Sequence, residues 1–382
     1  MPSIYDAILQ FNRDLNRREK EQMLDMALRW KTVEDNLRIY IERHAEAIAA
    51  RKAQGLAVSI TAQTRLDSYQ ELLRQVVAET TQYQRYANGI ITAEQSYYAE
   101  QGIIAARSAL VNEIGAGVAF NRVNVEAVNN IIGVAGDGSP LFSVLQKRAI
   151  APEAVAGLQN ALIEGVALGY SPRKTAKAMA DGLAQGLTKA LTIARTEQIR
   201  AYRTATLTQY RESGITEAYQ RHAAPSERTC LACIALDGKI YKSDKDFASH
   251  PNCRCFMTPI VAGVDAPQRS TQSWLERQDA DTQKKILGSH YKAYKDGVPL
   301  ADMVRVKQDK TWGPTISIRP LRDLKGKAIK AAAPAPPAPR VKKFVPAKTI
   351  EEANRYAVEE LGLGFADFEG SDLQTANAWN KG

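Results

Sequence analysis

The chain has 382 residues, of which 45% are hydrophobic and 24% charged, and its formal net charge is +9. This length suggests two to three domains, and the composition is ordinary for a globular protein with a core of good size. No apolar run approaches the roughly 18 residues that span a bilayer, and the first residues lack the apolar stretch of a signal peptide. The sequence therefore predicts a protein made in the cytosol that does not engage a membrane.

Residues 1–101 carry the clearest helical periodicity and are predicted to form a long helical hairpin. Larger side chains recur at steps of three and four over residues 5–54 and again in the segment that follows, as expected for one buried stripe on each of two helices. Gly55 is a typical helix stop, and Thr61 is a suitable cap for the second helix. The hairpin is expected to pack on more protein, from its own chain or from a partner. The two stripes consist of Met23, Met26, Trp30, Val33, Leu37, Tyr40 and His44, and of Leu66, Tyr69, Leu73, Val76, Thr80, Tyr83, Ala87, Ile90 and Tyr97.

The middle of the chain reads as helices that glycines and a turn interrupt. The run 136–140 is predicted to be a turn, and a helix is expected over residues 154–168. Residues 172–183 and 188–214 are predicted to form two separate helices, because proline suits the first helical position of the one and threonine suits the start of the other.

All four cysteines of the chain, with one of its four histidines, lie in one short stretch. Cys230 and Cys233 form a Cys-x-x-Cys pair, whose spacing lets both thiolates of a tight turn reach one zinc ion. Cys253 and Cys255 are two residues apart, about 6.6 Å along an extended strand, so they share a metal only if the backbone bends between them. His250 precedes Cys253 by three residues and could face the same metal from a turn. The predicted ligands are therefore four cysteines, or three cysteines with His250.

Two other states of the cysteines are compatible with this spacing. Disulfides are rare in the reducing cytosol where the chain is expected, but two disulfides, or reduced thiols in a small core, would also fit. Three short strands are predicted around the cysteines, at 216–222, 238–241 and 255–258, as the only substantial β region. Because so small a lobe hardly buries a core of its own, a metal clip would account for its stability.

These residues resemble the signature of the phage Mu F-like head morphogenesis proteins, also called minor head or minor capsid proteins. The resemblance rests on Thr229-Cys-x-x-Cys, Leu236-Asp237-Gly238-Lys239 and His250-Pro251-Asn252-Cys253-Arg254-Cys255, with Ala194-Arg195-Thr196-Glu197 upstream. Members of that family often have an aspartate two residues before the arginine of the Arg-x-Cys run and a tryptophan further upstream, where this chain has Ser226 and Tyr219. The residues that the resemblance implies as supports of the cysteine module are Arg195, Glu197, Arg228, Asp237, Gly238 and Arg254.

The resemblance implies a minor head protein of a tailed bacteriophage that acts in procapsid assembly near the portal. Its expected partners are the phage portal protein, the major capsid or scaffolding protein, and packaged double-stranded DNA. It is expected inside the head of the virion, and in the host cytoplasm during assembly, with no catalytic residue. The alternative is a metal-dependent nuclease or hydrolase built on the cysteine and histidine cluster, although no HExxH, Walker A or Gly-x-Ser-x-Gly motif is present.

The C-terminal part is predicted to be helical over residues 274–300, with breaks at Gly288 and Gly297 and His290 at the surface, and then strongly basic. Residues 300–344 hold eleven Lys or Arg against three Asp, a net charge of +8. Such a segment suits the phosphate backbone of DNA, to which it would bind without sequence preference, and a solvated flexible arm is the alternative. The residues expected to contact DNA are Lys325, Lys327, Lys330, Arg340, Lys342 and Lys343.

The predicted fold is mainly α with a small α+β module: a long N-terminal hairpin, a helical middle, a small lobe clipped by Cys and His, and a basic, proline-rich tail. The expected segments are the hairpin (1–101), the helical middle (102–187), the cysteine and histidine module (188–262), a helical and then basic extension (263–330), a Pro/Ala linker (331–347), and a tail or the start of an appended domain (348–382).

Overall fold

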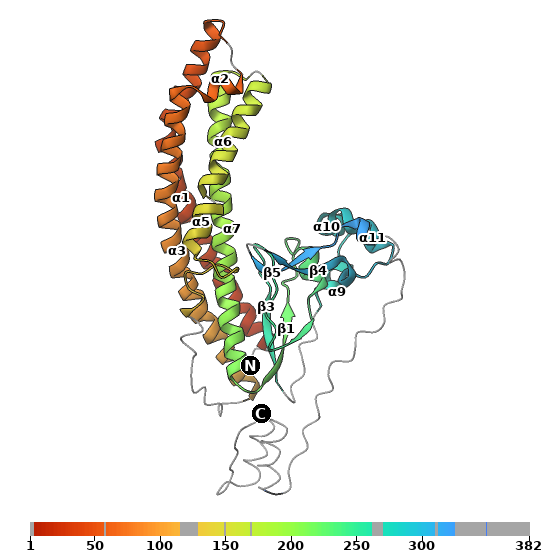
Figure 1. Ribbon diagram of the computed structural model, residues 1–382. Coiled ribbons are helices and arrows are strands. Elements are labelled where there is room, and N and C mark those ends of the chain that lie inside the picture. The colour runs from red at the N-terminus through yellow and green to blue at the C-terminus, as the bar shows by residue number, and fades with distance from the viewer. Residues whose placement is uncertain are drawn as a thin grey trace. The chain divides into compact units, whose positions relative to one another are not determined.

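The computed structural model describes residues 4–56, 59–114, 129–148, 150–168, 170–261, 270–309 and 312–324, and Thr349 (Figure 1). These residues form a mainly helical protein with a small antiparallel β part, as the sequence predicts. None of the described helices is long and apolar enough to cross a membrane. The six basic residues expected to contact DNA, the Pro/Ala linker and the tail apart from Thr349 lie outside the described residues.

The chain divides into two compact units, and the long helices α1, α3 and α7 contribute residues to both. We call Leu15–Ser96 with Ile132–Gln198 the helical unit, and Met1–Asp14 with Tyr97–Ile131 and Ile199–Gly382 the mixed unit. The helices are α1 (Ile4–Ala53), α2 (Ile60–Thr64), α3 (Asp67–Ile114), α5 (Leu141–Arg148), α6 (Ile150–Ala167) and α7 (Pro172–Glu212).

In the helical unit, α1 and α3 form the predicted antiparallel hairpin. Arg18 near the start of α1 pairs with Glu94 of α3 at 2.7 Å, whereas the Nδ1 atom of His44 lies 3.0 Å from the hydroxyl of Ser68, near the start of α3. A residue early in α1 thus contacts a residue late in α3, and a residue late in α1 contacts one early in α3. This order confirms that the hairpin is antiparallel.

Most residues of the apolar stripes of this hairpin are buried, whereas Tyr40, Leu66, Leu73, Ile90 and Tyr97 are half-buried. The rings of Trp30 and Tyr83 meet edge-on with centroids 4.8 Å apart, and Leu37 and Val76 have no exposed surface. Figure 1 shows α6 and α7 running alongside α1 and α3. Because the stripes stabilise the chain's own fold, a partner protein would have to bind another surface of these helices.

Two helices are longer than the sequence suggests, because glycines that resemble breaks lie where helices cross. α3 does not end near residue 101 but continues through Gly102, and α7 passes Thr188 without interruption, so the two predicted helices are one. A Cβ atom on Gly102 would lie 2.4 Å from the carbonyl oxygen of Tyr202 in α7. Glycine there permits contact between the two backbones, and tertiary packing overrides its low helix propensity.

The helix starts agree with the sequence in one place and differ in another. The hydroxyl of Ser171 accepts the N–H of Lys174 at 3.3 Å, so the predicted start of α7 is confirmed. The cap of α2 is Ser59, which accepts the N–H of Ala62 at 3.3 Å, whereas Thr61 lies inside that helix. A serine two residues earlier satisfies the free N–H groups of the first turn equally well, which the pattern could not distinguish.

A second glycine crossing, between α6 and α7, yields a stability prediction. A Cβ on Gly157 would lie 2.0 Å from the carbonyl oxygen of Gly182, and one on Gly182 would lie 2.4 Å from that of Gly157. Replacing Gly157 with Ala should therefore lower the free energy of unfolding of the helical unit by about 2 kcal/mol or more. Gly89 is the matched control, because it is exposed in the middle of α3 and no atom is in reach of an added Cβ. Gly89→Ala should raise the free energy of unfolding by about 0.5–1 kcal/mol. Urea unfolding followed by circular dichroism measures both, and equal effects of the two substitutions would contradict the crossing.

The mixed unit contains the predicted three-stranded sheet. Strands β1 (Thr216–His222), β2 (Ile240–Lys242) and β3 (Phe256–Val261) pair antiparallel in the order β2-β1-β3. Tyr219 in the central strand lies opposite Tyr241 on one side and Pro259 on the other. The central position of β1 explains why five of its last six residues are buried.

A second sheet lies where the sequence predicted only a basic segment. Strands β4 (Val304–Asp309) and β5 (Gly313–Ile318) form an antiparallel hairpin, so residues 215–259 are not the only β region. The N–H of Ile316 donates to the carbonyl oxygen of Ser249 at 2.9 Å, and Ser249 bridges to Thr315. The hairpin thereby holds the loop that leads into His250, a long-range contact that local patterning does not reveal.

The predicted helix over residues 274–300 is divided into short pieces, and His290 is buried instead of lying at the surface. Its side chain is 8% exposed, with the Nε2 atom 2.7 Å from the carbonyl oxygen of Arg319. The carbonyl gives the imidazole a partner, which makes burial tolerable. The pieces are α9 (Thr271–Glu276), α10 (Ala280–Leu287), α11 (Tyr291–Lys295) and the 3₁₀ helices η1 (Gly288–His290), η2 (Leu300–Met303) and η3 (Leu321–Leu324).

One hydrophobic core joins the cysteines to these C-terminal elements. Leu275, Leu287, Met303, Ile316 and Leu324, all at most 5% exposed, belong to the same cluster as three of the cysteines. The residues after 262 therefore supply much of the core on which the cysteine loops pack.

Candidate metal centre

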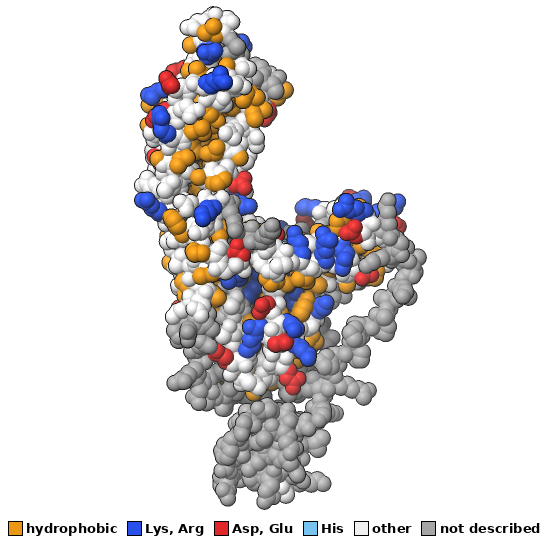
Figure 2. Space-filling model, in the orientation of Figure 1, with side chains coloured by type: hydrophobic (Ala, Val, Ile, Leu, Met, Phe, Trp, Pro, Cys, Tyr) orange, Lys and Arg blue, Asp and Glu red, His pale blue; other side chains and the backbone are white. Residues whose placement is uncertain are grey.

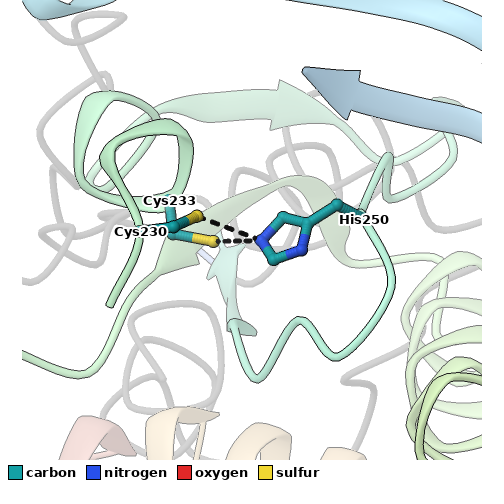
Figure 3. Close-up of side chains that lie close together, drawn as sticks. All are labelled: Cys230, Cys233 and His250. Carbon is teal, nitrogen blue, oxygen red and sulfur yellow. Dashed lines mark hydrogen bonds between the residues drawn. The ribbon is translucent and has the colours of Figure 1, made fainter. Parts of the chain in front are cut away.

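The Cys-x-x-Cys pair lies at the start of a short helix, α8 (Leu231–Ala235). Cys230 is the residue before its first turn, and the N–H of Cys233 donates to the carbonyl oxygen of Cys230 at 3.0 Å. This single turn places both sulfur atoms on one side. They lie 3.2 Å and 3.1 Å from the Nε2 atom of His250, toward which both point in Figure 3.

His250 is oriented by the backbone of the next residue. Its Nδ1 atom lies 2.7 Å from the carbonyl oxygen of Pro251, which can only accept, so Nδ1 carries a proton and donates. The Nε2 atom is thereby directed at the sulfur atoms. A histidine that binds metal through one nitrogen typically donates from the other in this way.

The backbone turns immediately before the Cys-x-Cys run. The N–H of Cys253 donates to the carbonyl oxygen of His250 at 3.0 Å, and Asn252 between them has a left-handed φ of 62°. The guanidinium of Arg203 in α7 donates to the carbonyl oxygens of both Cys253 and Cys255 at 2.8 Å. One side chain thereby holds the backbone from 253 to 255, directly before β3 begins at Phe256.

The donor atoms form two overlapping trios that share one cysteine. The Nε2 of His250 lies with the sulfurs of Cys230 and Cys233, and the sulfur of Cys233 lies with those of Cys253 and Cys255, all within 4.8 Å of one another in each trio. The sulfurs of Cys233 and Cys253 are 3.7 Å apart. Tetrahedral zinc with Zn–S bonds of about 2.3 Å needs sulfur atoms about 3.8 Å apart, so the donor set fits zinc. Five donors surround the place of a four-coordinate ion, and both predicted ligand sets remain compatible with the geometry.

Charge in the cluster is shared between sulfur and imidazole. Hydrogen bonds from Cys233 and then His250 lower the pKa of Cys230 to about 4. Hydrogen bonds from Cys233 and Cys255 lower the pKa of Cys253 well below its usual range. Burial alone would lower the pKa of His250, but hydrogen bonds to Cys230 and Cys253 outweigh it and raise that pKa to about 10. The thiolate, which is the form that binds metal, is therefore favoured at Cys230 and Cys253, whereas hydrogen bonds to Cys230 and then Cys253 raise the pKa of Cys233, and the pKa of Cys255 is raised to about 12.

Several of the predicted supporting residues lie around the cluster. The two carboxylate oxygens of Asp237 accept the N–H groups of Ala223 and Thr271, each at 2.6 Å, and so tie the end of β1 to the start of α9. Burial raises the pKa of Asp237, although these hydrogen bonds oppose the shift. Gly238 has a φ of 75° in the turn that leads to β2, and Arg254 is half-buried, whereas Arg228 is exposed.

The two positions that depart from the resembled family are also in ordered places. Ser226 accepts the N–H of Thr229 through its carbonyl oxygen at 3.0 Å, and the two hydroxyls lie 3.1 Å apart just before Cys230. Tyr219 stacks on Tyr241 with ring centroids 5.4 Å apart. A serine hydroxyl here contacts the turn that an aspartate would be expected to order.

The remaining two predicted supports belong to the helical unit. Arg195 of α7 forms an ion pair with Glu19 of α1 at 2.6 Å, and Glu197 accepts the N–H of Gly136 at 3.2 Å. These contacts hold α7 to α1 and to the turn before α5. A role of Arg195 and Glu197 in supporting the cysteine module stays a prediction.

Three residues of the site had no signal in the sequence. Arg203, Arg221 and Phe247 surround Cys253 and Cys255, and both arginines are almost fully buried. Arginine is among the residues least often buried, so pattern analysis assigns it to the surface. The burial of β1 offers no such signal either, because Ala218 to His222 are all buried and do not alternate.

Residues 156–258 match the family described as Phage Mu protein F like protein, and this range contains all five candidate ligands. No curated protein and no solved structure matches the chain significantly. Over residues 156–258 the chain is therefore similar to the phage Mu F-like proteins, a family of phage head proteins.

Proposed function

We propose that this chain is a minor head protein of a tailed bacteriophage that acts in head morphogenesis near the portal, with a structural zinc ion in its cysteine module. The observation that carries the proposal is the convergence of the five candidate ligands within the family match. The protein would be made in the host cytoplasm and end inside the virion head, with the portal and the major capsid or scaffolding protein as partners.

A structural role of the metal is favoured over a catalytic one by the burial of the donors. Cys233, Cys253 and Cys255 are 4%, 1% and 3% exposed, and they belong to the core that α9 to η3 complete. A hydrolytic zinc keeps one coordination position open to water and substrate, whereas a structural zinc is closed by four protein ligands. In this site zinc would fix the loops before α8 and β3 to each other, and the residues around it would orient the ligands.

Partner proteins would bind exposed apolar side chains and not the buried stripes of the hairpin. Leu24, Leu28 and Ile39 of α1 are 61%, 63% and 57% exposed, and their spacing of four and eleven residues puts them on one face. Figure 2 shows hydrophobic side chains gathered at the surface of the helices. Exposed apolar residues on one face are a common feature of protein interfaces.

Head incorporation tests this assignment. The variant Leu24→Glu/Leu28→Glu should stay folded, because both side chains already face water, and should be reduced about tenfold or more in purified particles that contain the portal. Val77→Glu/Ile163→Glu, which changes two exposed apolar residues of α3 and α6, is the control of equal polarity change. Quantitative immunoblotting of particles made in the phage background measures both. If the protein is absent from wild-type heads, the proposed function is wrong, and normal incorporation of the first variant would exclude only this face.

Contact with packaged DNA is the second part of the proposal, and it rests on the +8 charge of residues 300–344. If about five basic residues contact phosphates, the slope of log affinity against log salt should be about −4 to −5, because each contact releases condensed cations. The full chain with Lys325, Lys327, Lys330, Lys342 and Lys343 changed to Gln should bind all sequences more weakly and with a flatter slope. The matched control changes Lys20, Arg29, Lys31, Arg38 and Arg51 of α1 to Gln. Filter-binding titrations decide the matter, and equal retention of DNA by all three proteins would mean that these five lysines do not contact DNA.

A further inference from the structure

Two arginine side chains lie in the interior beside the cysteine cluster. Arg203 of α7 is 3% exposed and Arg221 of β1 is 2% exposed. Both guanidiniums contact the ring of Phe247, with their central carbons 4.9 Å and 4.4 Å from its centroid. A buried guanidinium is costly unless hydrogen bonds and an opposite charge compensate it, so two of them at one place need an explanation.

The hydrogen bonds of these arginines are directed at the Cys-x-Cys run and the loop before it. Arg221 donates from Nη1 to the carbonyl oxygen of Ala248 at 2.6 Å and from Nη2 to the sulfur of Cys253 at 3.7 Å. Arg203 donates to the carbonyl oxygens of Cys253 and Cys255. The two side chains thus contact the sulfur of one candidate ligand and the backbone of two.

The opposite charge comes from sulfur and not from a carboxylate. Within the part of the chain that the structure describes, neither Arg203 nor Arg221 forms an ion pair with Asp or Glu. The carboxylate of Asp237 interacts electrostatically with Arg221. Both carboxylate oxygens, however, already accept hydrogen bonds from the N–H groups of Ala223 and Thr271. A zinc ion with three thiolates and a histidine carries a net charge of about −1, and one with four thiolates about −2. The guanidiniums of Arg203 and Arg221, one of which lies 3.7 Å from the sulfur of Cys253, would compensate either negative charge.

We propose that Arg221 and Arg203 are positioning residues of the metal centre. Arg221 compensates the negative charge of the thiolates through its N–H contact with the sulfur of Cys253. Arg203 holds the backbone of Cys253 and Cys255, whose sulfur atoms lie with that of Cys233. This inference rests on the proposed zinc site and adds to it a pair of cations that no ligand motif contains.

The test compares zinc affinity in full-length, reduced protein by competition with a chromophoric chelator. Arg221→Met, which keeps the length of the side chain but removes its charge and donors, should lower the affinity about 10–100-fold, as loss of a partner of a metal ligand typically does. It should also shift the thiolate-to-metal band of the cobalt-substituted protein. Arg221→Lys, which keeps the charge, should retain most of the affinity. Arg211→Met is the matched control, because this arginine of α7 contacts Ser243 and Asp246 and no cysteine.

If Arg221 only fills space, the order of zinc affinities would be reversed: Arg221→Met would be close to wild type and Arg221→Lys would bind zinc more weakly. That result would overturn the proposal. If Arg221→Met is insoluble, Arg221→Gln, which keeps polar atoms without charge, is measured against the same control. If Arg221→Gln binds zinc as tightly as the wild type, the proposal is overturned as well. Absence of zinc from the wild-type protein would refute the metal centre itself, whereas zinc bound equally by wild type and Arg221→Met refutes only the role of the arginine.

Discussion

Replacing Cys233 with Ser should remove zinc from the protein and unfold the core of the mixed unit. The sulfur of Cys233 belongs to both trios of donors, so its loss disrupts either ligand set. Wild-type protein never exposed to chelator should contain about one zinc per chain, and the variant less than about a tenth of that. Because the binding energy of a structural zinc is folding energy, of order 10 kcal/mol in small zinc domains, the effect on stability should be large.

Two further substitutions show which four donors bind the ion. Cys255→Ser removes a donor only from the trio with Cys253, and His250→Asn removes one only from the trio with Cys230. If the ligands are three cysteines and His250, Cys255→Ser should keep its zinc and His250→Asn should lose it. The reverse result would indicate four cysteines. Elemental analysis gives the stoichiometry, and limited proteolysis shows whether the helices of the helical unit survive when the mixed unit unfolds. A zinc content below about a tenth of an equivalent in the wild-type protein would exclude a structural zinc site.

Ending the chain after residue 262 should prevent the mixed unit from folding, although the family match ends at residue 258. Such a chain lacks Leu275, Leu287, Met303, Ile316 and Leu324, which pack with the cysteines in one core. Burial of one such side chain contributes about 1.5–3 kcal/mol to the free energy of unfolding, whose total is about 5–15 kcal/mol for a typical domain. The loss of five such side chains is therefore comparable to the whole stability of the unit. Zinc binding should fall as well, because the loop before His250 loses its pairing with β5.

The control for this truncation ends after residue 324. It keeps every element of the mixed unit that the structure describes, from β1 to η3, and should melt like the full chain with its zinc retained. Thermal unfolding followed by tryptophan fluorescence, with zinc content measured in parallel, compares the three proteins. A chain of residues 1–262 that melts cooperatively with full zinc content would show that the C-terminal elements are an independent addition.

Local spacing in the sequence was sufficient for much of the fold. The stripes that include Trp30, Val76 and Tyr83 predicted the hairpin of α1 and α3, because an amphipathic helix repeats every 3.6 residues whatever covers it. The strands around Tyr219 were predicted within three residues at each end for a similar reason. The Cys-x-x-Cys and His-x-x-Cys-x-Cys runs placed five donors in one stretch, since a turn brings residues three apart to one point.

Tertiary structure alone decided the remaining features. Gly102 and Gly182 are interior to helices and not at their ends, because contact with another helix backbone compensates a helix propensity that is only about 1 kcal/mol worse than that of alanine. His290 is buried because a carbonyl oxygen 29 residues away accepts a hydrogen bond from its Nε2–H. Arg203 and Arg221 lie inside because residues about 30 to 50 positions later, at Cys253 and Cys255, provide sulfur and carbonyl partners. A polar side chain is buried or exposed according to the partners that the fold brings to it, and those partners are distant in sequence, so a local pattern cannot contain them.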